Sequence, residues 1–380
     1  MRSQPVFRTI ALLLPVIAGA QPATLHGTVE RIIVHGRSLE NNLEDDSPDR
    51  QVTVYLPPSY QGSPERRYPT LYFLHGFSSS DDYWFGRTRD HGPDLSRIMD
   101  AALSSGNTRE MILIVPNALT RYYGSFFSRS ATTGDWEQFI AQDLVDAIDA
   151  RYRTIPKAES RGLAGHSMGG YGALRIGIHY PQVFSTLYLL SACCLKTFTN
   201  EVQTEDKASA SSAGLSLGEL AETARGFAGR LSSVFTATNL EADTGNHPDP
   251  QVGEFLGMTT LAMSAAWSPD PASPPFYLDV PFLPSPQRTD ILAKWAQNMG
   301  LTIARQSTAN LKRLRIVGMD AGGQDELPQI PIEMAELDKL LKENRVPEVF
   351  ETYKGTHNDH IPDRLQHVVL PFFSRYLTGF

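Results

Sequence analysis

The 380-residue sequence predicts an α/β protein whose mainly parallel central sheet carries helices on both faces. Short, continuous apolar runs have the length and composition of strands that are buried on both sides. Segments with apolar residues at helical spacing separate these runs, as the crossover between two parallel strands requires. A content of 41% hydrophobic and 20% charged residues is typical of a globular protein with a sizeable core.

The first 20 residues, MRSQPVFRTIALLLPVIAGA, predict a signal peptide. Two arginines precede a short apolar run at residues 10–18, and the segment ends in AGA, an A-x-A cleavage pattern. The apolar run falls well short of the roughly 20 residues that span a bilayer. We therefore expect an exported protein, secreted or periplasmic and without a membrane span, whose mature chain begins near Gln21.

Two edge strands are expected first. Residues 29–36 (VERIIVHG) and 51–60 (QVTVYLPPSY) read as strands, with an acidic loop between them and a polar turn after them. A meander at the edge of a sheet has this pattern. The next two runs, 70–76 (TLYFLHG) and 111–117 (MILIVPN), are apolar throughout, which predicts strands buried on both faces.

Helices and further strands then alternate. Residues 94–104 and 136–151 are expected to be helices, because apolar side chains in the second recur at the spacing of one helix face. A strand at 161–165, a helix from about 168 to 180 and a strand at 185–191 continue the alternation. This order of elements predicts one growing parallel sheet.

Residues from about 196 to 310 break the pattern. They contain a serine-rich piece (KASASSAGLS), an expected helix (GELAETARGFAGRL) and a proline-rich run (SPDPASPPFYLDVPFLPSP). This stretch is too long for a simple loop, so we expect an insertion within one domain that extends over residues 21–380.

The core resumes after the insertion. A strand is expected within 311–322, a helix at 332–343, a strand at 348–353 and a last helix that ends at FFSRYL. The insertion therefore precedes the strand at 311–322, whose following loop carries the candidate acid discussed below.

Charge and cysteine content exclude several classes of protein. The formal net charge is −8 and no run of lysine or arginine occurs, so we expect no nucleic-acid partner. The two cysteines, Cys193 and Cys194, are adjacent and form no disulfide framework. Two buried free thiols are expected, and the alternative is a strained disulfide between the two neighbours. Neither cysteine has the spacing of a metal site, and we expect neither a metal nor a cofactor.

The stretch RGLAGHSMGGYGAL, residues 161–174, contains the pattern G-x-S-x-G around Ser167. One interpretation is a glycine-rich connection in which the serine is incidental. The other is a nucleophile elbow, a tight turn that presents a reactive serine between a strand and a helix. Because Ser167 follows an expected buried strand and opens an expected helix, the context favours the elbow.

A nucleophilic serine needs a general base, itself supported by a carboxylate. In the elbow fold these partners follow the serine in the order acid, then histidine. His357 and His360 lie in the loop after the last expected strand (YKGTHNDHIPDR), and we favour His357 because it is nearer the loop tip. His367 lies in the final helical pattern, where packing or surface exposure explains it.

The loop after RIVGM offers three candidate acids, Asp320, Asp325 and Glu326. Asp325 follows two glycines at the loop tip and is preferred, because Asp320 is still close to the strand and could instead bind loop amides.

An oxyanion hole normally uses the amide after the nucleophile and one amide from the loop after an earlier central strand. Met168 supplies the first donor. Because Gly76 permits close backbone approach at the end of the strand TLYFL, the amide of Phe77 is the best second donor, and Gly76 is the fallback. We expect His75 to order this loop rather than to act in catalysis.

Seven motifs in order resemble the esterase D-like branch, or Putative esterase family, of the α/β-hydrolases, which includes feruloyl esterases, S-formylglutathione hydrolases and mycolyltransferases. They are VYLPPSY, RYPTLYFLHGF, MILIVPNA, DLVDAIDARYRT, RGLAGHSMGGYGALR, DAGGQDEL and GTHNDHI...VVLPFFSRYL. The likeness covers about 25–195 and 311–380. It implies the α/β-hydrolase fold, Ser167 as nucleophile, Asp325 as acid, His357 as base, and oxyanion amides at Phe77 and Met168.

Together these observations predict an exported serine carboxylic ester hydrolase that acts through an acyl-enzyme on short-chain or hydroxycinnamoyl esters, small or linked to polysaccharide. Alternatives are acyl transfer to a sugar and a non-catalytic carbohydrate-binding protein on the same fold. Within the insertion, Trp267, Phe276 and Tyr277 are candidate substrate-binding surfaces, or they pack the insertion onto the core.

Overall fold

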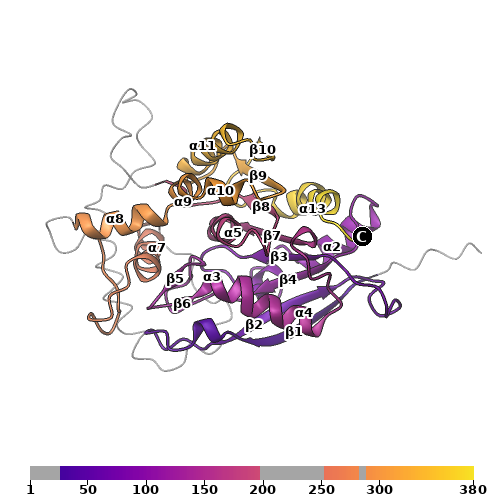
Figure 1. Ribbon diagram of the computed structural model, residues 1–380, viewed down its shortest axis with the longest axis horizontal. Helices are drawn as coiled ribbons and strands as arrows, with labels where there is room; N and C mark the ends of the chain where they lie inside the picture. Colours follow the sequence, from indigo (N-terminus) through magenta and orange to yellow (C-terminus); the bar gives the residue numbers. More distant parts are fainter. Residues whose placement is uncertain (1–25, 197–251, 282–287) are drawn as a thin grey trace, which may run out of the picture.

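The computed structural model describes residues 26–196, 252–281 and 288–380 (Figure 1). Within them, eight strands form one sheet in the order β1-β2-β4-β3-β7-β8-β9-β10. The strands are β1 (Thr28–His35), β2 (Asp49–Leu56), β3 (Thr70–Leu74), β4 (Ile112–Pro116), β7 (Arg161–His166), β8 (Thr186–Leu190), β9 (Ile316–Gly322) and β10 (Glu348–Tyr353). Strand β2 is antiparallel to β1 and β4, and all other pairs are parallel. The predicted mainly parallel sheet is therefore confirmed.

Helices cover both faces of this sheet. Alternating side chains of β3 divide between two apolar layers, with Tyr72 and Leu74 in one and Leu71 and Phe73 in the other. The first layer is covered by α4 (Leu144–Arg151), α5 (Met168–His179) and α11 (Gln329–Glu343), and the second by α2 (Leu95–Ser104) and α13 (Leu370–Tyr376). Strands buried on both sides explain the continuous apolar runs of the sequence.

Short helical segments connect the strands and helices of the core. They are η1 (Arg37–Leu39), α1 (Asp81–Trp84), α3 (Trp136–Gln138), the π-helical turn η2 (Phe139–Asp143), η3 (Ala158–Ser160), α12 (Ile361–Arg364) and the π-helical turn η5 (Leu365–Val369). The expected helix at 136–151 is thus one helical stretch with a widened turn inside it.

The predicted boundaries differ from the structure at several elements: β2 ends at Leu56 rather than 60, β3 ends at Leu74 rather than 76, and α11 and β9 differ as well. Helix α11 begins at Gln329, three residues before the expected start at 332, because a proline at 331 is tolerated in the first turn of a helix. In the segment 311–322, residues 311–315 form the end of a short helix and a turn, and strand β9 begins only at Ile316.

The described part of the insertion is helical and packs onto the core. It contains α7 (Val252–Trp267), α8 (Thr289–Asn298), α9 (Gly300–Gln306) and α10 (Thr308–Leu311). Helix α9 contacts α5, and α7 contacts α8 and β5 (Arg129–Ser130), which forms a small hairpin with β6 (Gly134–Asp135). In Figure 1, α7 and α8 lie at the opposite end of the view from α2 and the C-terminus.

Some expectations cannot be compared with the structure. The expected signal peptide at 1–20 and the expected helix GELAETARGFAGRL lie outside the described residues. Within the described ranges, every helix is too short or too polar to cross a membrane.

Candidate active site

Ser167 stands between β7 and α5 in an unusual backbone conformation, with φ 56° and ψ −117°. Residues other than glycine seldom adopt a positive φ, because such a conformation costs about 1–3 kcal/mol and persists only where the surroundings enforce it. Here the Ser167 amide donates to Leu190 O at 2.9 Å, and Ser167 O accepts from the Tyr171 amide at 3.1 Å. The strained residue is therefore held from both the neighbouring strand and its own helix.

The two glycines of the G-x-S-x-G pattern allow this turn. A Cβ atom on Gly165 would lie 2.2 Å from the carbonyl oxygen of Gly169, and one on Gly169 would lie 2.0 Å from that of Leu74. Both contacts are with backbone atoms, which cannot move aside as a flexible side chain can. The pattern is a steric requirement of the β7–α5 turn in this structure.

The structure joins Asp325 and His357 directly. Asp325 follows β9 and its carboxylate is fully buried, while His357 follows β10. His357 Nδ1 lies 2.7 Å from Asp325 Oδ2, and Asp325 Oδ1 accepts from the Leu327 amide at 2.8 Å. With Nδ1 engaged, Nε2 is the ring nitrogen left for proton transfer. The amide of His357 also donates to Glu326 Oε2 at 3.0 Å, which holds the loop of the histidine against the loop of the acid.

The alternative acid and base occupy different surroundings. Asp320 is buried on β9, where its Oδ2 accepts from Arg364 Nε at 3.0 Å and from the Tyr188 hydroxyl at 2.9 Å. His360 is exposed at the start of α12, with its ring roughly perpendicular to that of Tyr353. Asp320 thus has a structural role between β8, β9 and α12, and His360 has no carboxylate partner among the described residues.

His166 connects the elbow with the loop of His357. The rings of His166 and His357 have centroids 4.8 Å apart, and His166 Nε2 lies 3.0 Å from His357 O. Burial, followed by the nearby charge of His357, lowers the pKa of His166 to about 3. His166 is therefore neutral at pH 7 and donates this hydrogen bond without introducing a buried charge.

Of the two hydrogen bonds expected in a Ser-His-Asp triad, the structure contains the one between acid and base. No hydrogen bond among the described residues joins Ser167 Oγ to His357. Such bonds in enzymes without substrate are often long and shorten when substrate binds. The serine, next in the chain to His166, nevertheless lies at the same edge of the sheet as the Asp325–His357 pair.

The side chains of Phe77 and Met168, the two residues expected to supply oxyanion amides, approach the same glycine. A Cβ atom on Gly124 would lie 2.6 Å from Met168 Sδ and 2.8 Å from Phe77 Cδ2, so both side chains meet at this glycine. Neither the Phe77 nor the Met168 amide donates a hydrogen bond to another described residue. A Cβ atom on Gly76 would make only ordinary van der Waals contacts, at 3.5 Å or more, with His166 and Ser167.

His75 orders the loop that carries Phe77. Its Nδ1 lies 2.8 Å from Gly76 O, and its Nε2 accepts from the Ala118 amide at 2.8 Å. Burial lowers the pKa of His75 to about 4, so the ring is neutral at pH 7. The Ser78 amide donates to Tyr123 O at 2.8 Å, a second bond to the same neighbouring loop. No motif in the sequence indicates that residues 118–127 support this loop.

The sequence model of the Putative esterase family matches residues 47–367. The chain belongs to this family. Among curated relatives, Esterase Rv1288 of Mycobacterium tuberculosis is 34% identical over 136 residues, which are 36% of this chain and 27% of that protein. The endo-1,4-beta-xylanase/feruloyl esterase of Xylanibacter ruminicola is 28% identical over 165 residues, 42% of this chain and 22% of that protein. The match thus spans about a quarter of the length of these curated relatives.

Solved structures share the fold of this esterase family member. A ferulic acid esterase aligns with a TM-score of 0.57 at 20% identity, covering 93% of this chain and 100% of the other. An S-formylglutathione hydrolase from Staphylococcus aureus aligns with a TM-score of 0.53 at 15% identity, covering 93% and 100%. These likenesses confirm the predicted α/β-hydrolase fold.

Trp267 is a core residue of the esterase domain. It is 3% exposed, its Nε1 donates to Ser128 Oγ at 3.0 Å, and its ring packs against Phe126, Tyr171 and Trp295. This environment corrects the expectation of a substrate surface in favour of packing. The sequence did not indicate that Trp267, which directly precedes a proline-rich stretch, would end helix α7 with its side chain in the core.

Phe276 and Tyr277 lie in a turn of the insertion and are half-buried. The carbonyl of Phe276 accepts from the Tyr122 hydroxyl at 2.6 Å, and that of Tyr277 accepts from the Thr132 hydroxyl. The turn is thus fixed to the loop before β5 and to the β5–β6 hairpin.

Phe255, on α7, reaches the candidate site although the sequence drew no attention to it. Its ring centroid lies 5.7 Å from that of Phe77 in an edge-to-face arrangement, and both rings are half-buried. Phe77 carries a proposed oxyanion amide, so this pair is an aromatic surface from the insertion beside the site. An apolar residue in an apolar helix offers no sequence signal for such a role.

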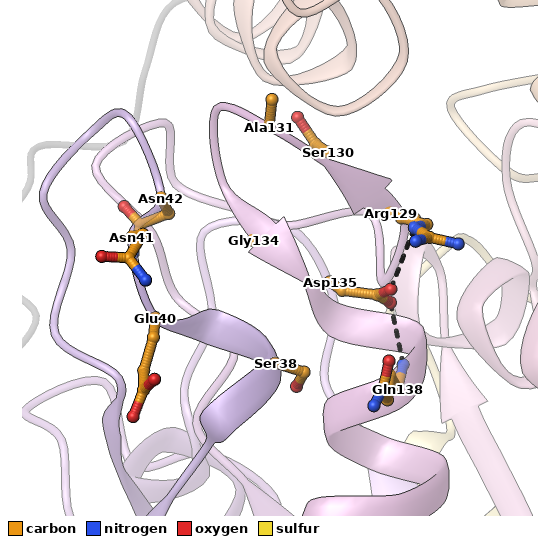
Figure 2. A pocket seen from close by; sticks show the side chains of 10 residues that line it. All are labelled: Ser38, Glu40, Asn41, Asn42, Arg129, Ser130, Ala131, Gly134, Asp135 and Gln138. Carbon is orange, nitrogen blue, oxygen red and sulfur yellow. Dashed lines mark hydrogen bonds and ion pairs between the residues drawn. The ribbon is translucent and has the colours of Figure 1, made fainter.

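A polar surface pocket of about 620 Å³ lies between η1 and the β5–β6 hairpin (Figure 2). None of its lining residues is a candidate catalytic residue. Asp135 pairs with Arg129 at 3.1 Å and accepts from the Gln138 amide at 3.0 Å, so these groups hold the hairpin. The described residues contain no group of three side chains suited to bind a metal ion.

Replacing Gly169 by alanine should damage the elbow, because the added Cβ would meet the backbone oxygen of Leu74. We expect a loss of about 3 kcal/mol or more in the free energy of unfolding, at the upper end of overpacking effects. Gly62→Ala is the matched control, since its nearest contact would be 4.0 Å, and it should change stability by no more than about 0.5 kcal/mol. Chemical denaturation measures both variants, and equal stabilities would contradict the steric interpretation.

Proposed function

We propose that this chain is a serine carboxylic ester hydrolase in which Ser167 is the nucleophile, His357 the general base and Asp325 the supporting acid. The observation that carries the proposal is a strained serine at an elbow, placed at the same sheet edge as a buried Asp–His pair 2.7 Å apart. Membership of the Putative esterase family supports the same reaction class.

In this mechanism His357 Nε2 accepts the proton of Ser167 Oγ while the oxygen attacks the ester carbonyl. Asp325, bonded to Nδ1, keeps the proton on that nitrogen and stabilises the imidazolium that forms. The amides of Phe77 and Met168 donate to the carbonyl oxygen as it becomes negative. His357 then protonates the leaving alkoxide, which leaves the acyl group on Ser167. In the second half of the reaction His357 accepts a proton from water as the water attacks the acyl-enzyme, and it returns that proton to Ser167 Oγ as the acid product leaves.

For the substrate we propose short-chain or hydroxycinnamoyl esters, small or linked to polysaccharide. The half-buried rings of Phe77 and Phe255 would accept an aromatic acyl group beside the oxyanion amides. One relative is named as an endo-1,4-beta-xylanase/feruloyl esterase, which supports this class. The signal-like segment at 1–20 supports export, where such esters are found and a glutathione thioester is not.

Ser167→Ala should abolish ester hydrolysis and labelling by a fluorophosphonate probe, while the folded state remains. The side chain makes no hydrogen bond to the described residues, so its loss removes reactivity rather than packing. Probe labelling followed by peptide mass mapping, with hydrolysis of aryl acetates, measures both effects. Retention of more than a few per cent of activity in pure variant protein would exclude Ser167 as the nucleophile.

His357→Ala should lower kcat by about a thousandfold or more, because base catalysis and its support by Asp325 are both lost. His360→Ala is the matched control, three residues along the same loop and exposed, and should retain kcat within a few-fold. Steady-state kinetics on one ester compares the two variants. The reverse order of effects would move the base to His360.

Phe255→Ala should raise KM for a hydroxycinnamoyl ester several-fold more than KM for an acetyl ester, because only the aryl group would reach the Phe77–Phe255 surface. Phe276→Ala is the control within the same insertion. A selective effect at Phe276 instead would restore the sequence-based choice of substrate surface. Equal effects on both esters would show that α7 only supports the fold.

A further inference from the structure

Two cysteines lie beside the elbow, in the loop that follows β8. Cys193 and Cys194 are both half-buried free thiols, and their Sγ atoms are hydrogen-bonded at 2.7 Å. We propose that this pair is a thiol modification site, oxidised by small-molecule disulfides to a vicinal disulfide that lowers turnover at Ser167. The inference rests on the proposed function for its effect on activity, but not for the oxidation itself.

The backbone of Cys193 is bonded to the proposed oxyanion hole. Its amide donates to Ser167 O at 3.3 Å, alongside the Tyr171 amide at 3.1 Å. The carbonyl of Ser167 and the N–H of Met168 belong to one planar peptide unit, so they rotate together. A change in the direction of the Cys193 amide therefore changes the hydrogen bonding that orients the Met168 donor.

The residues on both sides of the pair are held in place. Upstream, Leu190 O accepts from the Ser167 amide at 2.9 Å. Downstream, the amides of Leu195 and Lys196 donate to the buried carboxylate of Glu333 at 3.0 and 3.2 Å. Backbone adjustment in this loop must consequently fall on residues 192–194.

Closing a disulfide between neighbours demands such an adjustment. Disulfides usually join Cα atoms 4.4–6.8 Å apart, whereas consecutive Cα atoms stay about 3.8 Å apart across a trans peptide, so the ring that contains both cysteines closes only with strain in the 193–194 peptide. Cys194 has a φ of 61° and its carbonyl accepts from the Gly300 amide at 3.1 Å, so the carbonyl side of Cys194 is held and its amide side is left to move. Oxidation should therefore rotate the 193–194 peptide and weaken the Cys193–Ser167 hydrogen bond.

The chemistry is thiol–disulfide exchange. The Cys193 thiolate attacks one sulfur of a disulfide RSSR and expels RS⁻, and Cys194 then attacks the mixed disulfide and expels the second RS⁻. The two cysteine protons end on these leaving groups, so two cysteine thiols and RSSR give one cysteine disulfide and two RSH. The hydrogen bond with Cys193 and burial raise the pKa of Cys194, which favours Cys193 as the first nucleophile.

The test treats the full-length protein with oxidised glutathione and analyses the peptide that contains both cysteines by mass spectrometry. We expect the loss of two hydrogens without retained glutathione. In the same samples kcat for an aryl acetate should fall about ten-fold or more and recover with a reducing thiol, since outright loss of an oxyanion donor lowers kcat by about 10²–10³. The double variant Cys193→Ser/Cys194→Ser, which has no thiol at this site, should keep its kcat under the same treatment, whereas Cys194→Ser alone should retain glutathione on Cys193.

Amide hydrogen exchange separates this inference from the proposed function. Oxidation should speed exchange at the Cys193 and Tyr171 amides, which share Ser167 O, and this readout needs no esterase activity. If the reduced protein hydrolyses no ester, the proposed function fails. Amide exchange then still shows whether oxidation of the cysteine pair weakens the hydrogen bonds to Ser167 O. Failure to form the disulfide, or its formation with unchanged kcat and unchanged exchange, would overturn the inference.

Discussion

The close fit of the first turn of α5 against the sheet is the constraint on which the site depends. Gly169 lies directly on the carbonyl of Leu74, and Gly165 lies against Gly169, with no room for a Cβ at either position. With the helix so near, the chain can turn from β7 into α5 only through a residue with positive φ, and that residue is Ser167. The strain is local, of the order of 1–3 kcal/mol, and the packing of α5 on β3, β7 and β8 maintains it.

Parallel strand order brings the other groups to this turn. Strands β3, β7, β8, β9 and β10 all run in one direction, so the loops after them meet at one edge of the sheet. Those loops carry Phe77, Ser167, the two cysteines, Asp325 and His357 respectively. Two further histidines, His75 and His166, are buried and neutral at pH 7, and they connect the loops through hydrogen bonds without charge.

The insertion contributes to this edge in two ways. Trp267 joins an aromatic cluster with Phe126, Tyr171 and Trp295, so part of the insertion has become core. Phe255, about three helical turns before Trp267 on α7, instead meets Phe77 with both rings half-buried. One helix thus both anchors the insertion and places an aromatic surface near the proposed site.

The sequence by itself determined the α/β class, the order of the core strands and helices, and the elbow, because apolar periodicity and local glycine sterics act over a few residues. It also indicated Asp325 and His357, through their positions after strands. Tertiary structure decided what depends on contacts between distant segments. Asp325 is hydrogen-bonded to His357, while Asp320 is bonded to Arg364 and Tyr188. Trp267 is buried in the core, and Phe255 packs against Phe77. No local pattern encodes such partners, since each is chosen by the packing of elements far apart in the chain.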